Sequence, residues 1–148
     1  MKFVIQRVKH ASVTVEHQVI GKINQGFLVF IGVCEADNED VAEKMIKKLI
    51  GLRIFKDENG KTNLDLRSVG GELLLVSQFT LYADCKKGNR PSFVNAAKAE
   101  KANALYEYII LECKKQVEVV ECGEFGADMK VELLNDGPFT IVLNSEEL

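Results

Sequence analysis

Hydroxyl and amide side chains gather at the end of an apolar run, and they are the first residues of the chain that point to chemistry. Residues 73–76 (LLLV) lead without a break into residues 77–81 (SQFTL). A buried hydroxyl or amide group without a hydrogen-bond partner costs roughly 1 to 3 kcal/mol, so a core rarely keeps several of them. Ser77, Gln78 and Thr80 therefore mark either a functional site or a set of core polar groups that have found partners.

A basic loop follows this polar segment directly. Residues 82–93 contain glycine, proline and charge, a composition typical of an ordered loop, and loops often carry function. The cations Lys86, Lys87 and Arg90 predict an RNA contact through phosphate groups. A solvated surface loop is the alternative, because the net charge of the chain, −3, gives no general attraction to nucleic acid. We expect no DNA partner.

Other common catalytic and metal-binding patterns are absent from the sequence. There is no Gly-x-Ser-x-Gly nucleophile motif, and the only histidines, His10 and His17, are expected at the surface or in a hairpin. The four cysteines lack the close pairs that a zinc site usually requires, so we expect free and mostly buried thiols. These observations predict neither a metal site nor a cofactor.

The element that positions the first group of residues is a strand over 72–81. Four consecutive apolar residues indicate that both faces of its first half are buried. Side chains alternate along a strand, so Gln78 and Thr80 are expected on one face, with Ser77 and Phe79 on the other.

The remaining elements follow from hydrophobic periodicity and turn residues. Amphipathic helices are expected over 41–50, capped by Asn38 or Asp37 and ended by Gly51, and over about 96–115, capped by Asn95 or Ser92. Further strands are expected at 3–5, 11–15, 26–33, 54–55, 117–122, 130–134 and 139–143, and residues 135–138 (NDGP) should form a turn between the last two.

This order of elements predicts an α+β fold. We expect a curled antiparallel or mixed β-sheet, barrel-like, with the two main helices packed outside it. A length of 148 residues and a hydrophobic content of 47% favour one domain over residues 1–148. No apolar run approaches the roughly 20 residues that cross a bilayer, and the first residues turn to charge too early for a secretion signal. We therefore expect a cytoplasmic protein without membrane contact.

Two motifs together resemble those of the D-aminoacyl-tRNA deacylase family, also called D-tyrosyl-tRNA(Tyr) deacylases. They are residues 77–80 (SQFT) and 135–140 (NDGPFT), and either alone would be a weak signal. The similarity continues over residues 6–8 (QRV), 11–15 (ASVTV) and 87–93 (KGNRPSF). Phe139 departs from the pattern, because a small aliphatic residue is expected after the proline.

The resemblance implies a hydrolase that acts on carboxylic ester bonds. Its substrate would be the ester between a D-amino acid, or glycine, and the 3'-terminal adenosine of tRNA, and L-aminoacyl-tRNA would be rejected. Such an enzyme serves quality control in translation. The resemblance also implies a homodimer in which a segment of one subunit is inserted into the active site of the other, and it implies no cofactor.

The resemblance assigns the catalytic region to Ser77, Gln78, Phe79 and Thr80. Ester hydrolysis requires an attacking oxygen, stabilisation of the oxyanion and a route for protons. Thr80 is the candidate nucleophile, but a threonine without an activating base is a poor one. The alternative uses the backbone N–H groups of Phe79 and Thr80 to hold the oxyanion, while the ribose 2'-hydroxyl of the substrate positions or activates water.

The resemblance assigns substrate binding to Gly137, Pro138, Arg7, Asn135 and Thr140. In the family the Gly-Pro peptide is cis, which would turn the carbonyls of Gly137 and Pro138 toward the pocket, where they exclude an L side chain. Arg7 would hold this backbone with its fork of donors, and a surface ion pair is the alternative.

Two other functions compete with this interpretation. One is a non-catalytic RNA-binding module, since a fold does not prove a chemistry. The other is a hydrolase of small D-amino acid esters or amides, which would not need the basic loop.

Overall fold

The computed structural model describes residues 1–148 as a mixed sheet with two helices. The strands are β1 (Lys2–Val15), β2 (Gln18–Ile23), β3 (Gly26–Gly32), β4 (Phe55–Lys56), β5 (Thr62–Leu64), β6 (Glu72–Ser77), β7 (Val120–Cys122) and β8 (Lys130–Asn144). The helices are α1 (Glu39–Ile50) and α2 (Ala99–Lys114), and short 3-10 turns are η1 (Arg67–Val69), η2 (Phe79–Tyr82) and η3 (Ser145–Glu147).

The main sheet is mixed and nearly closes into a barrel. Its strand order is β2-β1-β3-β6-β7, and β8 pairs with β1. The β3–β6 and β6–β7 pairs are parallel, whereas β1 pairs antiparallel with β2, β3 and β8. The two ends of this order meet, because a Cβ on Gly21 of β2 would lie 3.0 Å from the carbonyl oxygen of Cys122 in β7. The prediction of a barrel-like mixed sheet is confirmed.

Strand β6 has apolar neighbours on both faces, which explains its unbroken apolar run. Leu73 and Leu75 belong to the core between the sheet and the helices, whereas Leu74 and Val76 belong to the core inside the barrel. Burial on both faces is typical of parallel strands covered by helices. It makes β6 a rigid support for the residues that follow it.

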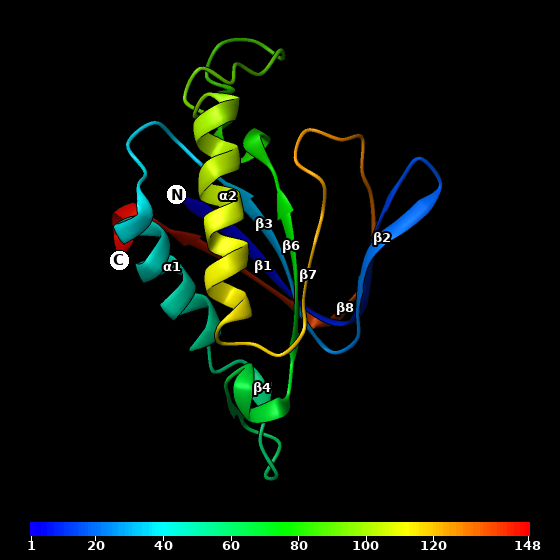
Figure 1. The fold of residues 1–148 in the computed structure, drawn as a ribbon. Helices are drawn as coiled ribbons and strands as arrows, with labels where there is room; N and C mark the ends of the chain where they lie inside the picture. The colour runs from blue at the N-terminus through cyan, green and yellow to red at the C-terminus, as the bar shows by residue number, and fades with distance from the viewer.

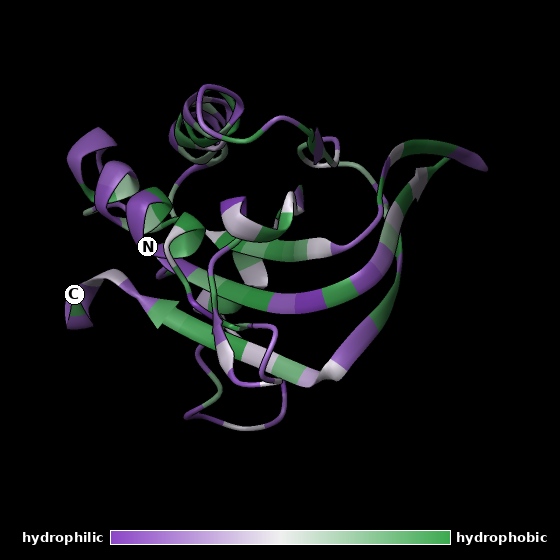
Figure 2. Ribbon diagram, turned by 90° about the horizontal axis from the view of Figure 1, so that it is seen from below, coloured by the Kyte–Doolittle hydropathy of each residue, from purple (hydrophilic) through white to green (hydrophobic).

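Both helices pack on the outside of the sheet, as predicted. Figure 2, which looks nearly along α2, shows α1 and α2 on the same side of the curved strands. Of the two predicted caps of α1, Asn38 is the correct one, since its Oδ1 accepts a hydrogen bond from the Val41 N–H at 3.0 Å. Helix α2 begins only at Ala99, and neither Asn95 nor Ser92 caps it. The segment before it forms a turn over residues 94–96 and is then held to the end of β3, because the Ala97 N–H donates to the carbonyl of Val33 at 2.9 Å.

The strand predicted over 72–81 ends at Ser77, so its last four residues were assigned wrongly. Strand β3, the partner of β6, ends at Gly32, and the last ladder bond runs from the Gln78 N–H to the Ile31 carbonyl at 2.7 Å. Beyond this point no strand remains to pair with, and the chain enters the 3-10 turn Phe79–Tyr82.

The predicted turn between the last two strands was also wrong, because β8 runs unbroken from Lys130 to Asn144. Gln6 pairs with Thr140 and Val8 pairs with Asn135, so residues 136–139 lie opposite the single residue Arg7. The segment therefore bulges out of the sheet without reversing the chain. It keeps this course because β1, its partner, is itself one continuous strand that joins the predicted strands 3–5 and 11–15.

The remaining expectations are met in part. Of the four free cysteines only Cys113 is buried, Cys34 and Cys122 are half-buried, and Cys85 is exposed. His10 is exposed on β1 and His17 lies in the β1–β2 hairpin turn, as predicted. Neither helix is long and apolar enough to cross a membrane.

Candidate active site

Gln78 and Thr80 lie together after β6, and of the two only Gln78 lines the adjacent cavity. Gln78 Nε2 donates a hydrogen bond to Thr80 Oγ1 at 2.6 Å. The predicted neighbourhood of these two side chains is thus present, although the 3-10 turn creates it and strand alternation does not. Thr80 is exposed, and 53% of the Phe79 side chain is accessible to solvent.

The start of the 3-10 turn presents backbone donors. Its first residues are Phe79 and Thr80, and no carbonyl inside the turn can accept the N–H groups of its first residues. The amide that follows the turn is already hydrogen-bonded, since the Ala83 N–H donates to the Thr80 carbonyl at 3.0 Å. The free N–H groups can therefore bind a ligand oxygen.

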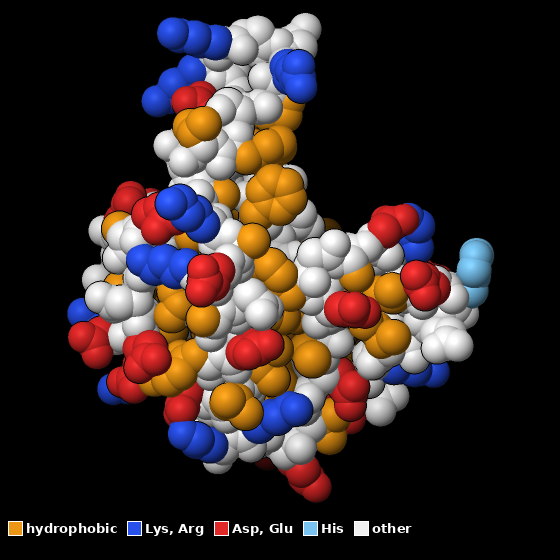
Figure 3. Space-filling view, turned by 45° about the horizontal axis from the view of Figure 1, so that its top comes forward, with side chains coloured by type: hydrophobic (Ala, Val, Ile, Leu, Met, Phe, Trp, Pro, Cys, Tyr) orange, Lys and Arg blue, Asp and Glu red, His pale blue; other side chains and the backbone are white.

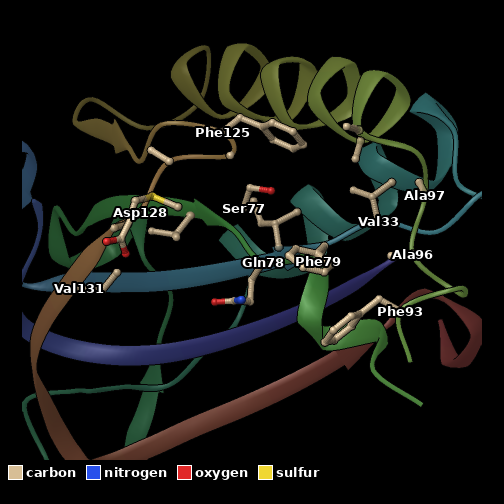
Figure 4. A pocket seen from close by; sticks show the side chains of 17 residues that line it. Val33, Ser77, Gln78, Phe79, Phe93, Ala96, Ala97, Phe125, Asp128 and Val131 are labelled. Carbon is tan, nitrogen blue, oxygen red and sulfur yellow. The ribbon is translucent and has the colours of Figure 1, made fainter. Parts of the chain in front are cut away.

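The cavity beside this turn has a volume of about 610 Å³ and mostly apolar walls. Figure 4 shows the Phe125 ring projecting into it beneath α2, Phe79 and Phe93 at one end, and Asp128 at the other. Ser77 and Gln78 supply polar groups on the side of β6. An apolar pocket with a few convergent polar groups is typical of small-ligand sites.

Sequence reasoning missed the wall of this cavity opposite β6. Phe125 and Met129 line it from the loop between β7 and β8. Behind them the Tyr106 hydroxyl is buried. It lies 2.8 Å from the Leu75 carbonyl oxygen and 2.9 Å from the Gly123 carbonyl oxygen, and it donates to these two acceptors. Burial raises the pKa of Tyr106, so the hydroxyl keeps its proton. The only feature of the sequence that could have indicated this wall is a tyrosine among the apolar positions of α2.

The Gly137–Pro138 segment is held by a buried arginine. Arg7 Nε donates to the Asp136 carbonyl at 2.9 Å, and Arg7 Nη1 donates to the Ile54 carbonyl. The guanidinium also lies 4.7 Å from the centre of the Phe139 ring, a cation–π contact. The Arg7 side chain is buried, so the alternative of a surface ion pair does not describe it.

Asn135 closes the bulge from the other side. Its Oδ1 accepts a hydrogen bond from the Phe139 N–H at 2.7 Å, and its Nδ2 donates to Thr140 Oγ1 at 3.1 Å. Gly137 has φ 139°, and a Cβ there would lie 2.9 Å from Arg7 Nη2. The Gly137–Pro138 peptide bond is cis.

The two motifs do not meet within one chain. In the sheet, β3 and β1 lie between β6, which carries Ser77, and β8, which carries Gly137. Gly137 and Pro138 are not among the residues that line the cavity beside Phe79. The chain thus carries the two motifs at two separate places, each here called a half-site because it holds one of the two motifs.

The basic loop stands apart from the body of the molecule as a finger, defined here as residues 84–92 (Figure 1). Its base is closed by two backbone hydrogen bonds between Asp84 and Ser92, at 2.7 and 2.9 Å. Lys86, Lys87 and Arg90 are all exposed at its tip. Figure 3 shows basic side chains gathered at this end of the molecule.

The sequence model of the family described as "D-Tyr-tRNA(Tyr) deacylase" matches residues 4–144. The chain belongs to this family. The predicted resemblance is therefore confirmed, and the deacylase motif residues occupy the two half-sites described above.

Curated relatives of this deacylase family span the whole chain. A D-aminoacyl-tRNA deacylase of Lactobacillus delbrueckii subsp. bulgaricus is 54% identical over 144 residues, covering 97% of this chain and 99% of its own. One of Thermosipho africanus is 52% identical over 148 residues, covering 100% of this chain and 99% of its own.

Two solved structures share the deacylase fold. One, named "c-Myc DNA Unwinding Element Binding Protein", superimposes with a TM-score of 0.92 at 40% identity, over 97% of this chain and 98% of its own. The other, a "probable eukaryotic D-amino acid tRNA deacylase", has a TM-score of 0.85 at 15% identity, over 96% and 97%. At that identity the second comparison concerns the fold alone.

Proposed function

We propose that this protein hydrolyses the ester between a D-amino acid, or glycine, and the 3'-terminal adenosine of tRNA, and rejects L-aminoacyl-tRNA. The observation that carries the proposal is the occurrence of both family motifs, each in an ordered half-site, in a chain 52% identical over 148 residues to a curated deacylase. Such an activity would remove wrong-handed amino acids before translation uses them.

The cavity beside Phe79 suits the terminal adenosine. Phe125, Ala97 and Met129 offer apolar and aromatic surface to a base, and bases stack favourably on aromatic rings. Ser77 and Gln78 lie on the β6 side, where they can bind the sugar hydroxyls. The ester would then lie over the start of the 3-10 turn.

For catalysis we favour backbone donors and the RNA itself over Thr80 as a nucleophile. Gln78 donates a hydrogen bond to Thr80 Oγ1, which draws electron density from this oxygen and makes it a weaker nucleophile. Neither His10 nor His17 lines the cavity, so no imidazole is available beside the 3-10 turn as a base. The N–H groups of Phe79 and Thr80 would stabilise the oxyanion of the tetrahedral intermediate. The adjacent ribose 2'-hydroxyl would position the attacking water.

The chiral filter would come from a second subunit. Within one chain the Gly137–Pro138 segment is separated from the cavity by two strands, so a pocket that uses both needs two copies. Arg7 holds the Asp136 carbonyl before this segment, and Asn135 holds the Phe139 N–H after it. The carbonyls between these two points could exclude an L side chain by contact while a D side chain points outward. Glycine has no side chain to exclude, so glycyl-tRNA is also a substrate. The proposed assembly is a homodimer with active sites at the subunit interface.

The finger would bind the phosphates of the tRNA end. Its three cations at the tip are exposed and have no acidic partner among the ion pairs of the chain. Phosphate contacts of this kind weaken as salt concentration rises. The proposed site of action is the cytoplasm, where aminoacyl-tRNA is used.

The deciding experiment follows loss of the ester from D-tyrosyl-, L-tyrosyl- and glycyl-tRNA with purified protein. Cleavage of the D-tyrosyl and glycyl esters with the L-tyrosyl ester spared is expected. A D-tyrosyl-tRNA ending in 2'-deoxyadenosine should be a poor substrate, and its hydrolysis at the normal rate would rule out the role of the 2'-hydroxyl. If no ester is cleaved, the deacylase function fails.

Two alternatives make different predictions in the same assay. A hydrolase of small D-amino acid esters would cleave a D-tyrosine methyl ester as well as D-tyrosyl-tRNA. A nucleic-acid-binding module, as the name of the c-Myc unwinding element relative suggests for that protein, would bind without cleavage. The net charge of −3 disfavours binding to duplex DNA, which needs many cationic contacts.

A further inference from the structure

An exposed apolar strip joins the basic finger to the cavity, and packing in the core does not account for its exposure. The strip, here called the neck, consists of Phe79, Phe93 and Val94. Phe79 is 53% exposed and Val94 is 82% exposed. The Phe79 and Phe93 rings meet edge to face at a centroid distance of 4.9 Å. Figure 3 shows hydrophobic side chains running from below the basic tip down to the hollow of the molecule.

The neck is held in place by backbone hydrogen bonds on both sides. Above it, Asp84 and Ser92 exchange two bonds at the base of the finger. Below it, the Ala96 N–H donates to the Phe93 carbonyl at 3.1 Å and the Ala97 N–H donates to the Val33 carbonyl at 2.9 Å. The exposure of Val94 is therefore a fixed feature of the surface.

The dimensions of the finger limit what the neck can contact. From Ser92 to Gly88 the chain runs over four residue steps, which span at most roughly 14 Å. Stacked nucleotides rise by about 3.4 Å each, so this length corresponds to about four nucleotides. With the terminal adenosine in the cavity, the finger reaches only the single-stranded end of a tRNA.

We propose that the neck binds the base of the nucleotide that precedes the terminal adenosine, while Lys86, Lys87 and Arg90 bind the neighbouring phosphates. This inference rests on the proposed function, because it takes the cavity as the adenosine site. Aromatic and apolar surface next to exposed cations is the arrangement that binds single-stranded nucleic acid without reading its sequence. A protein partner would gain little from the isolated cations at the tip.

The absence of tryptophan from the chain permits a direct binding test. Val94→Trp introduces a single tryptophan, which can be excited selectively, on the neck, and Val19→Trp introduces one at a valine of β2 that is 60% exposed. The probe is the trinucleotide CpCpA. We expect saturable quenching of the Val94→Trp fluorescence, weakened by added salt, and no quenching in Val19→Trp. Equal quenching in both variants, or none in Val94→Trp, overturns the proposal.

A kinetic comparison gives a second readout. The substrates are the D-tyrosyl esters of adenosine and of the dinucleotide CpA. In the parent protein kcat/KM for the CpA ester should exceed that for the adenosine ester by about tenfold, the contribution of one stacked base. Val94→Asp should lower this ratio several-fold, whereas Val19→Asp should preserve it. A ratio near one in the parent protein contradicts the neck site.

The two readouts separate this inference from the proposed function. If neither ester nor D-tyrosyl-tRNA is cleaved, the deacylase function fails, and the quenching by CpCpA still decides whether the neck binds a nucleotide. If all esters are cleaved but Val94→Trp is not quenched, the enzyme stands and the neck site is rejected.

Discussion

The Nε atom of Arg7 lies 2.9 Å from the carbonyl oxygen of Asp136, so a buried guanidinium holds the main chain of the bulge directly. Its Nη1 donates to a second carbonyl, that of Ile54, in the connection between α1 and β4. Both hydrogen bonds are to backbone carbonyls, and the Asp136 carboxylate adds an ion pair, with Oδ2 3.6 Å from Arg7 Nε. Arg7 thereby ties the Gly137–Pro138 segment to the core.

Arg7→Lys should destabilise the protein although it keeps the charge. Lysine lacks the planar fork that reaches two carbonyls at once, and each hydrogen bond to a charged group contributes roughly 1.5 to 3 kcal/mol. We expect a loss of about 2 kcal/mol in the free energy of unfolding in urea. Lys9→Ala is the control, since Lys9 is 55% exposed and only approaches Asp136 Oδ2 at 3.4 Å. Equal effects of the two substitutions would show that the fork is not needed.

Gly137→Ala should damage the proposed filter. A Cβ at this position would lie 2.9 Å from Arg7 Nη2, and φ is 139°, so the bulge must shift. A misplacement of about 1 Å can cost roughly 100-fold in rate, and we expect a loss of this order in kcat/KM on D-tyrosyl-tRNA. Gly60→Ala is the matched control, because Gly60 also has positive φ, 75°, but a Cβ there meets nothing within 4 Å. Full activity of Gly137→Ala would contradict the role of this segment.

Thr80→Ala should remain active. The variant keeps the backbone N–H groups of the 3-10 turn and removes only the hydroxyl that Gln78 Nε2 contacts. We expect kcat on D-tyrosyl-tRNA to fall by less than about tenfold, well below the cost of losing an oxyanion-hole donor. Circular dichroism checks that the variant is folded. Abolished turnover in a folded Thr80→Ala would restore the hydroxyl as the nucleophile.

Neutralising the finger should weaken activity on tRNA in a salt-dependent way. Replacing Lys86, Lys87 and Arg90 by glutamine removes three phosphate contacts, so the slope of log(kcat/KM) against log salt should become shallower by about 2. The loss should be smaller on D-tyrosyl-adenosine, which has no phosphate. Replacing Lys44, Lys47 and Lys48 of α1 by glutamine makes the same charge change on another face. If both triple variants behave alike, the finger has no special role.

Stability should fall at alkaline pH because buried groups keep their protons in the folded state. Burial raises the pKa of the Cys113 thiol from 9.0 to about 12. The native state then binds this proton more tightly than the unfolded chain, so the stabilisation is full below pH 9 and is lost as pH rises toward 12. We expect a slope of up to about 1.4 kcal/mol per pH unit from this group in urea unfolding.

Two substitutions test the source of that slope. Cys113→Ala should make the slope smaller. Part of the slope should remain, because burial also raises the pKa of Tyr106 and Tyr82. Cys85→Ala should leave the slope unchanged, because Cys85 is exposed. An identical slope in Cys113→Ala and the parent protein would contradict the assignment.

The sequence was informative wherever local pattern decides structure. The cap at Asn38 and the burial of residues 73–76 on both faces follow from residue types and spacing alone. The two motifs could be found in the same way. The sequence does not show how far apart the two motifs lie in space, and within one chain β3 and β1 separate them.

The errors arose where a distant partner decides the outcome. Strand β6 ends at Ser77 because β3 ends at Gly32, and nothing in the residues 77–81 carries that information. Residues 135–138 have turn composition, but pairing with the continuous β1 converts the turn into a bulge. Tyr106 went unnoticed because its role depends on two carbonyls in β6 and the segment after β7.

Strand β8 is paired with β1 on both sides of the bulge, from Lys130 to Asn144. A single inserted or deleted residue on either side would slide its pairing by about 3.3 Å and turn its inward side chains outward. Evolution can therefore change the length of this chain near Gly60, where a Cβ meets nothing within 4 Å, but not within β8. Alignments of homologues should run without gaps over residues 130–144, and length variation should collect in the β4–β5 turn.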